Sequence, residues 1–160
     1  MILFSVSHSV RKAFRIIPVD TTPVVNSLDW FRFWRIDARR ISGRGEIMLF
    51  TNYETLYTFV ADCREFRTGP DFAMHFLHRF NEVFAGRFGY PDEIKERMIV
   101  HRAVDRSVVA VMNSFFLDIH YCDPRESVRE LEERINDTPI ISRDHFPAGR
   151  LREKLEHERY

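Results

Sequence analysis

Cysteine and lysine are scarce in this chain of 160 residues, and its positive and negative charges cancel. The two cysteines, Cys63 and Cys122, show neither a paired spacing nor neighbouring metal ligands, so we expect reduced thiols in a reducing compartment. With 24 basic and 24 acidic side chains, the chain lacks the bulk charge by which many proteins hold nucleic acid or anionic lipid. Any such contact would need a local patch.

Long apolar runs and familiar catalytic motifs are also missing. No run approaches the roughly 18 apolar residues of a membrane span, and the apolar N-terminus carries its positive charges after the apolar stretch, unlike a secretory signal. The phosphate loop, the hydrolase nucleophile turn, the H-E-x-x-H zinc motif and the C-x-x-C pair are all absent. We therefore expect a cytoplasmic protein without a membrane segment, and no cofactor is indicated.

The residues that are abundant predict one packed α+β domain over residues 1–160. The chain holds 15 phenylalanines, and each buried ring removes about 150–250 Å² from water. Residues 30–41 alternate as a strand, Ser42–Gly45 form a turn, and residues 46–51 form a second strand that is apolar on both faces. This hairpin, with further short strands, predicts a small antiparallel sheet, and we expect the helices to cover it on one side.

The most regular helical pattern begins at Thr68 and runs to about Phe88, with phenylalanines along one broad stripe. Opposite that stripe, the spacing predicts a narrow polar arc of Asp71, His75, His78 and Glu82. Imidazole and carboxylate groups one turn apart can share a divalent ion, so a metal-dependent hydrolase is one interpretation. A solvated polar face explains the same spacing and is favoured, because further ligands are not marked elsewhere in the sequence.

A second candidate site lies in the predicted hairpin, where the segment from residue 30 to 44 carries five arginines and one acid. Aromatic rings that stack on bases and arginines that meet phosphates are typical of single-strand nucleic-acid binding. The residues that would carry this role are Trp30, Arg32, Trp34, Arg35, Arg39 and Arg40. The favoured alternative is a hairpin whose aromatics face the core and whose arginines pair with nearby acids.

The third candidate is an uncharged polar group at the end of the second strand and along a later, mostly apolar helix. It consists of Asn52, Thr55, Arg106 and Asn113. Buried polar side chains must find hydrogen-bond partners, so the strand-end and helix groups are expected to meet. They would form either a structural network or a pocket that orients a ligand.

Several short motifs resemble, in their order and spacing, a family of small bacterial proteins that is a domain of unknown function. The motifs are Trp30, residues 33–40 (FWRIDARR), residues 48–56 (MLFTNYETL), residues 105–108 (DRSV) with Met112 and Asn113, and residues 136–139 (NDTP). The resemblance covers most of the chain. It implies a single bacterial domain and brings no activity, cofactor or catalytic residue.

The leading hypothesis is a non-catalytic binding or interaction module, with an unidentified protein or small molecule as its partner. It follows from the absence of a recognisable nucleophile, catalytic base or metal motif in a chain of ordinary composition. A nucleic-acid-contacting protein and a metal-dependent hydrolase are the alternatives, and nucleic acid is not the favoured partner. Whether the chain is an enzyme is left open, with the weight against it.

Overall fold

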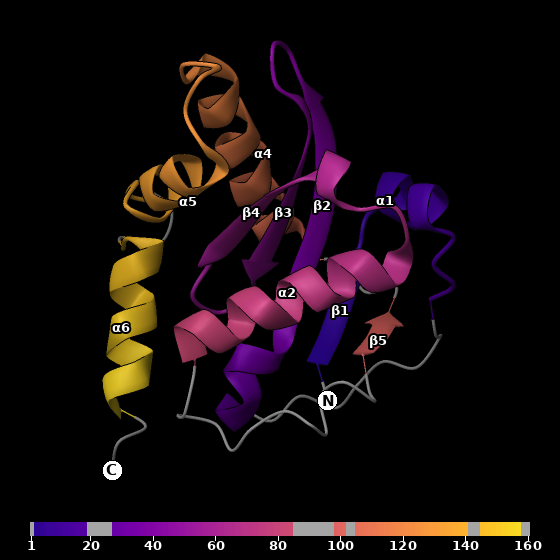
Figure 1. Cartoon of the computed structure of the whole chain (residues 1–160). Helices are drawn as coiled ribbons and strands as arrows, with labels where there is room; N and C mark the ends of the chain where they lie inside the picture. The colour runs from indigo at the N-terminus through magenta and orange to yellow at the C-terminus, as the bar shows by residue number, and fades with distance from the viewer. Residues whose placement is uncertain (1, 19–26, 85–97, 102–104, 141–144, 158–160) are drawn as a thin grey trace.

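The computed structural model describes residues 2–18, 27–84, 98–101, 105–140 and 145–157. Its sheet has five strands in the order β4-β3-β2-β1-β5. The strands are β1 (Ile2–Val6), β2 (Phe33–Ile41), β3 (Gly45–Asn52), β4 (Thr58–Asp62) and β5 (Met98–His101). The helices are α1 (His8–Phe14), α2 (Gly69–Phe84), α4 (Arg106–Tyr121), α5 (Val128–Asn136) and α6 (Pro147–His157), with 3-10 turns η1 (Ser27–Arg32) and η2 (Cys63–Glu65). The α+β class is confirmed (Figure 1).

The predicted hairpin is present, but the sheet around it is mixed rather than antiparallel. β2 and β3 pair antiparallel from Trp34–Asn52 to Ile41–Gly45, and Gly43 and Gly45 take the positive φ angles of the turn. β1, however, lies parallel to both β2 and β5. The chain between β1 and β2 contains α1 and η1, a connection long enough to return the chain to the same end of the sheet. A tight turn would have forced the antiparallel arrangement.

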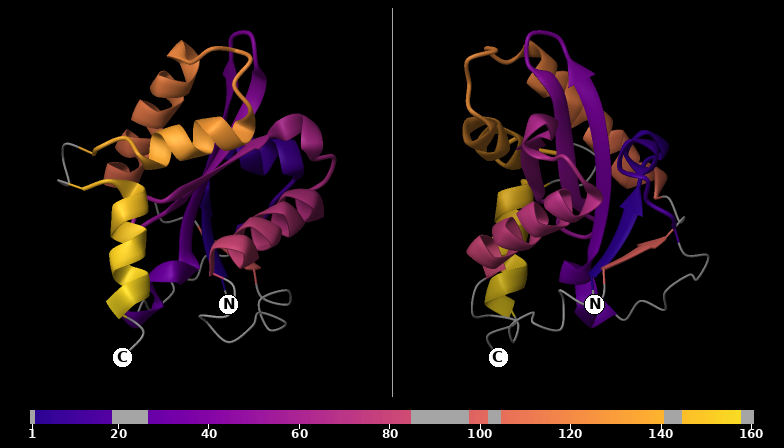
Figure 2. Two further views of the ribbon diagram at one scale, coloured as in Figure 1. Left: turned by 60° about the vertical axis from the view of Figure 1, so that its left-hand side comes forward. Right: turned by 45° about the vertical axis from the view of Figure 1, so that its right-hand side comes forward.

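Helices cover both faces of the sheet, so the expectation of one covered side is wrong. One face packs Trp34, Phe50 and Phe59 against α2 and α6, and the other packs Leu49 and Val60 against α4 and α5. Figure 1 shows α2 in front of the sheet and α4 behind it, and Figure 2 shows the same two layers from other sides. The cause is that β3 and β4 are buried along both faces, which must each be shielded from water.

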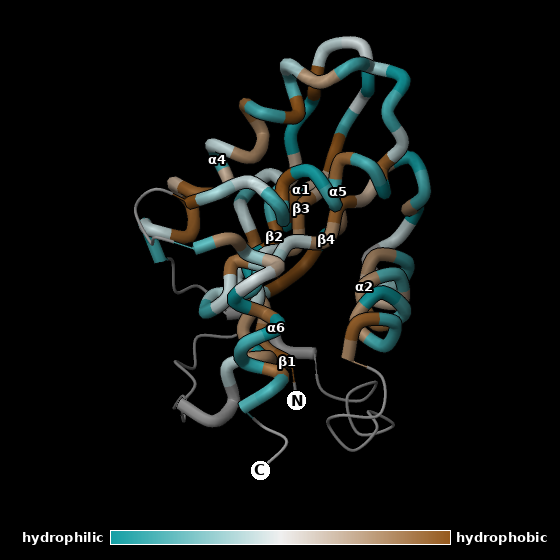
Figure 3. Tube along the Cα trace, turned by 90° about the vertical axis from the view of Figure 1, so that its left-hand side faces the viewer, coloured by the Kyte–Doolittle hydropathy of each residue, from teal (hydrophilic) through white to brown (hydrophobic). Residues whose placement is uncertain are grey.

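α2 forms where the phenylalanine pattern predicts it, and its described part ends at Phe84. Phe72, Phe76 and Phe80 recur every fourth residue and enter the core around Trp34, a periodicity visible in the alternating colours of α2 in Figure 3. The Asp71 carboxylate accepts hydrogen bonds from the backbone N–H groups at residues 67 and 68, which precede the helix. None of the described helices is long and apolar enough to cross a bilayer.

α5 closes the outer edge of the sheet through its side chains. The Asn136 amide accepts from the Thr58 N–H at 2.8 Å and donates to the Thr58 carbonyl at 2.8 Å, as a neighbouring strand would. One turn earlier, the Glu132 carboxylate accepts from the Val60 N–H at 2.9 Å. An open edge strand invites pairing with other chains, so these two side chains also protect β4 from aggregation.

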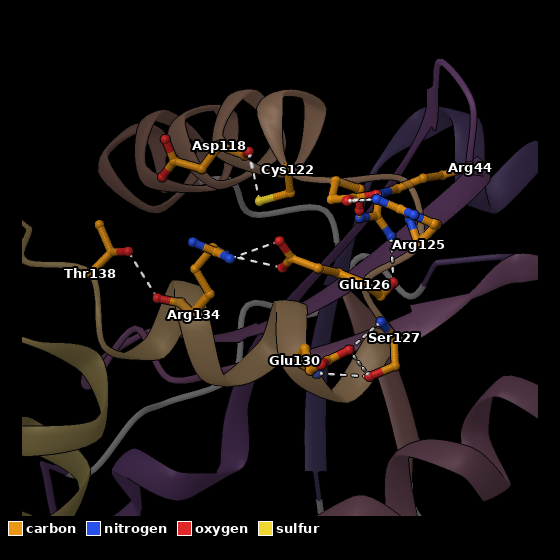
Figure 4. Close-up of polar contacts among 10 residues, drawn as sticks. Arg44, Asp118, Cys122, Arg125, Glu126, Ser127, Glu130, Arg134 and Thr138 are labelled. Carbon is orange, nitrogen blue, oxygen red and sulfur yellow. Dashed lines mark hydrogen bonds and ion pairs between the residues drawn. The ribbon is translucent and has the colours of Figure 1, made fainter.

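The loop between α4 and α5 is fixed to the hairpin turn by an arginine (Figure 4). Arg44 donates to the backbone carbonyls of Glu126, at 2.8 Å, and of Asp123. Ser127 and Glu130 form a capping box that starts α5. Arg44, one of the five arginines of the basic hairpin, therefore positions the two helices behind the sheet.

Candidate functional site

Asn52 and Thr55 lie together in the turn between β3 and β4, where both are fully buried. The Asn52 amide donates to the carbonyls of Trp30 and Phe33, and its oxygen accepts from the Glu54 N–H, the Thr55 N–H and the Thr55 hydroxyl. All its hydrogen-bonding capacity is thus used within the protein. These two residues hold the turn in place and leave no polar group for a ligand.

Arg106 and Asn113 do not join that network. Both are exposed on α4, and among the described residues neither forms a hydrogen bond to Asn52 or Thr55. The Asn113 amide oxygen accepts from Arg39, whose guanidinium also lies 4.7 Å from the centre of the Phe116 ring. The structure therefore divides the expected group of four into a buried turn and an exposed helix face.

The strand-end turn and the start of α4 nevertheless meet, at Tyr53 and Asp105, which belong to none of the candidate sites predicted from the sequence. Tyr53 lies between Asn52 and Thr55 in the chain, and its buried hydroxyl is near the Ser5 side chain, the Arg35 charge and the Asp105 backbone. Burial raises the pKa of Tyr53, and these neighbours partly offset the rise. Arg35 itself is 7% exposed and donates to the Ser5 hydroxyl at 2.6 Å. We call Ser5, Arg35 and Tyr53 the buried arginine cluster.

The aromatic residues proposed for nucleic-acid contact are in the core. Trp34 is completely buried, stacks on Phe59 with ring centres 5.0 Å apart, and donates from its indole to the Phe31 carbonyl. Trp30 is buried as well and packs against Phe84. In this conformation neither indole has a face on which a base could stack. A nucleic-acid role would rest on Arg32, Arg39 and Arg40, of which Arg39 and Arg40 are exposed.

The polar arc of α2 is divided between three environments. Asp71 precedes the others and caps its own helix, as described above. His75 is half-buried between Phe50 and Phe66, whereas His78 is exposed and 3.4 Å from Glu82. Burial and the nearby Arg79 charge lower the pKa of His75. Within the described ranges, no three histidine, cysteine or carboxylate side chains are grouped closely enough to hold a metal ion.

A cleft of about 210 Å³ does lie beside this arc, between α2, α5 and the edge of β4. Arg79 and Glu132 form a buried ion pair in its wall, and Glu82 contacts both Arg79 and, at 3.5 Å, Arg129. The cleft is below the roughly 300–1,000 Å³ of typical ligand pockets. Its charged groups are satisfied by one another, so it is better explained as a structural seam between α2 and α5.

A larger cavity, of about 460 Å³, lies between α4 and the segment after α5. Its walls are mainly apolar, with a few hydroxyl groups, which is the composition typical of sites for apolar ligands. The lining residues are Ser107, Ala110, Val111, Ser114, Phe115, Thr138, Pro139 and Ile140. Sequence reasoning identified α4 as buried and so missed this site; the signal was the recurrence of small residues at 107, 110 and 114.

Comparison with known proteins gives a family but no activity. The profile of a family described as "Domain of unknown function (DUF6933)" matches residues 4–148, nearly the whole chain. No curated protein and no solved structure matches. The family match accords with the resemblance found in the sequence, and the geometry must supply any functional hypothesis.

Proposed function

We propose that this chain, which belongs to the DUF6933 family, is a non-catalytic interaction module that binds through the outer face of α4. The description of the family assigns no activity, so the proposal is drawn from the geometry of the chain alone. The observation that carries this proposal is an apolar cavity of about 460 Å³ beside a helix face with exposed apolar side chains. Leu117 is 56% exposed and Tyr121 is 79% exposed. Contiguous exposed apolar surface on a soluble domain typically marks an interaction site.

The outer face of α4 has the residue spacing of a helix-pairing seam. Its members alternate steps of three and four residues, and they are Ser107, Ala110, Ser114, Leu117 and Tyr121. No ionisable residue occurs from position 107 to position 117, although an outer helix face is ordinarily charged. α5, by contrast, carries five charged residues among its nine. The composition of α4 favours burial of its outer face against another helix.

The partner that fits this face best is α4 of a second copy of the chain. The small residues lie in the first half of the seam and the large ones in the second. In an antiparallel pair with its twofold axis at Ser114, Leu117 of one copy is level with Val111 of the other, in the wall of the cavity. Tyr121 is then level with Ser107. The twofold axis repeats the Tyr121–Ser107 pairing in both copies, so a large residue meets a small one on each side of the axis, as the self-complementary surface of an isologous interface requires.

Substitution of Leu117 by glutamate is expected to abolish self-association. Sedimentation velocity of the wild type should show a monomer that converts to a dimer as concentration rises, and Leu117→Glu should raise the dissociation constant at least tenfold, equal to about 1.4 kcal/mol. The matched control is Met74→Glu, because Met74 is 57% exposed on α2, outside the seam. It should dimerise like the wild type.

A cross-linking arm tests the position of the axis. Ser114→Cys should form an intermolecular disulfide under mild oxidation, because residues beside a twofold axis approach the short Cα separation that a disulfide needs. Ser42→Cys, exposed in the hairpin turn, should not. A wild type that stays monomeric up to about 1 mM, or equal dimerisation of Leu117→Glu, would exclude α4 self-pairing.

A further inference from the structure

Among the residues that the structure describes, two arginines are buried to below one-tenth exposure, and only one of them has a carboxylate partner there. Arg79 contacts the carboxylates of Glu82 and Glu132. Arg35, which is buried to the same extent, has no carboxylate within ion-pair distance in the described part of the chain. Its only hydrogen-bond partner there is the Ser5 hydroxyl, and its buried Nε has none. Within the described ranges, Arg35 therefore holds a positive charge away from water with no carboxylate paired to it.

The nearest acid along the same strand is already engaged. Asp37 follows Arg35 by two residues, so it lies on the same face of β2. One Asp37 oxygen accepts from the Ala38 N–H at 2.9 Å, and the other lies 3.8 Å from Arg39. Asp105, at the start of α4, uses one oxygen to accept from the N–H and hydroxyl of Ser107. Neither carboxylate pairs with Arg35.

A second polar group without a partner lies in the same cluster. The buried Tyr53 hydroxyl has no hydrogen bond of good geometry among the residues that the structure describes, although the Ser5 side chain, the Arg35 charge and the Asp105 backbone are near enough to offset part of the rise that burial causes in its pKa. A buried donor without an acceptor destabilises the folded state, and a buried charge without a partner does so more strongly. A guanidinium N–H and a phenol that lack acceptors in one buried cluster are donors that an acceptor-rich anion would satisfy together.

We propose that the buried arginine cluster binds a small oxyanion, a phosphate or carboxylate group, between the Arg35 guanidinium and the Tyr53 hydroxyl. The planar guanidinium presents paired N–H donors that match two oxygens of such a group. The Ser5 hydroxyl orients the guanidinium from its other side. The start of α4 lies beside the cluster, because the backbone of the exposed Asp105 is near the Tyr53 hydroxyl. This site does not depend on pairing of α4 with a second copy.

The test is stabilisation of the full-length protein by inorganic phosphate and, in a separate arm, by acetate, with chloride at equal ionic strength as the reference. An anion at ten times its dissociation constant reduces the unfolding equilibrium constant about elevenfold if it binds only the folded state. We expect this shift in the wild type with at least one of the two anions. The arm that gives the larger shift identifies the phosphate or the carboxylate as the preferred group.

Three variants assign the effect to the cluster. Arg35→Met should lose the anion-dependent shift and, without anion, should be as stable as the wild type or more so, because an unpaired buried charge is removed. Tyr53→Phe removes one hydroxyl and should weaken anion binding severalfold. Arg40→Gln, an exposed arginine on the same strand, should respond like the wild type. Equal shifts in the wild type and Arg35→Met, or none beyond chloride in the wild type, would overturn the proposal.

Discussion

Replacement of Asn52 by alanine is expected to lower the free energy of unfolding by about 4 kcal/mol or more. The change removes the Asn52 hydrogen bonds to the Trp30 carbonyl and to the Glu54 and Thr55 N–H groups, whereas the Phe33 carbonyl still accepts from the Tyr53 N–H. Each buried group left unsatisfied costs about 1–3 kcal/mol. The measurement is urea unfolding followed by circular dichroism, with the slope checked against the wild type.

Two further variants separate this turn from the exposed helix face. Thr55→Val removes only the hydroxyl that donates to Asn52 and accepts from the Tyr57 N–H, so a loss of about 1–2 kcal/mol is expected. Asn113→Ala, exposed and bonded to Arg39 alone, should change stability by less than about 0.5 kcal/mol. If Asn52→Ala proved as mild as Asn113→Ala, the turn would be held by something other than this side chain.

The backbone conformation of the turn between β3 and β4 explains why its stability depends so strongly on the Asn52 side-chain amide. Leu56 takes a left-handed backbone conformation, with a φ of 61°, which costs a non-glycine residue of order 1–3 kcal/mol. Its side chain is fully buried in the cluster behind the sheet, so glycine cannot replace it without loss of packing. The hydrogen bonds of Asn52 therefore hold the chain in a conformation that the backbone alone disfavours.

The hairpin and α2 could be predicted because each is specified by a pattern of residues that are close together in the sequence. The hairpin follows from alternation along residues 33–41 and from glycines that can adopt positive φ, and α2 follows from phenylalanines one turn apart. The long-range pairings have no such signal. Asn136 completes the edge of β4 across 78 residues of sequence, and nothing near it indicates which strand it would meet. The parallel partners of β1 are also distant in the chain, 30 residues away in β2 and 96 residues away in β5.

In the candidate sites, too, the sequence predicted some features, and contacts between distant segments determine the others. Arg35 and Arg39 are identical in type and lie on one face of one strand, yet Arg35 is buried and Arg39 exposed. Arg35 lies in the part of β2 that pairs with β1 and donates to Ser5, whereas Arg39 lies beyond that pairing, and the sequence does not specify where the pairing ends. His75 and His78 are likewise one turn apart, but the ring of Phe66, brought back by η2, covers only His75. The spacing of residues in the sequence predicted the correct strand and helix, whereas tertiary contacts determine whether each side chain is buried or exposed.

Removal of the Arg79 side chain beyond its stem, by Arg79→Met, is expected to cost about 3–5 kcal/mol at neutral pH. The variant leaves the Glu132 carboxylate buried without its cation, and only the Val60 N–H still donates to it. It also removes a guanidinium that lies 5.6 Å from the centre of the Phe59 ring. Chemical unfolding at pH 7 measures the loss.

The double variant Arg79→Met/Glu132→Gln should recover most of that loss, because the glutamine oxygen can still accept from the Val60 N–H without carrying a charge. Glu132→Gln alone completes the double-mutant cycle and isolates the coupling between the two side chains. Arg129→Met is the matched control, since Arg129 is exposed and lies 3.5 Å from Glu82. Its effect should stay below about 1 kcal/mol.

The pH dependence distinguishes an unpaired charge from a loss of packing. Burial already raises the pKa of Glu132 above its ordinary value of 4.5, and the Arg79 charge opposes that rise. Without Arg79 the folded-state pKa must rise further. A group whose pKa is higher in the folded state stabilises the fold most below its unfolded pKa and loses that contribution as the pH rises. The deficit of Arg79→Met relative to the double variant should therefore shrink as the pH falls from 7 toward 4.5. A deficit that stays constant over this range would mean that lost packing against Phe59, rather than the stranded carboxylate, destabilises the variant.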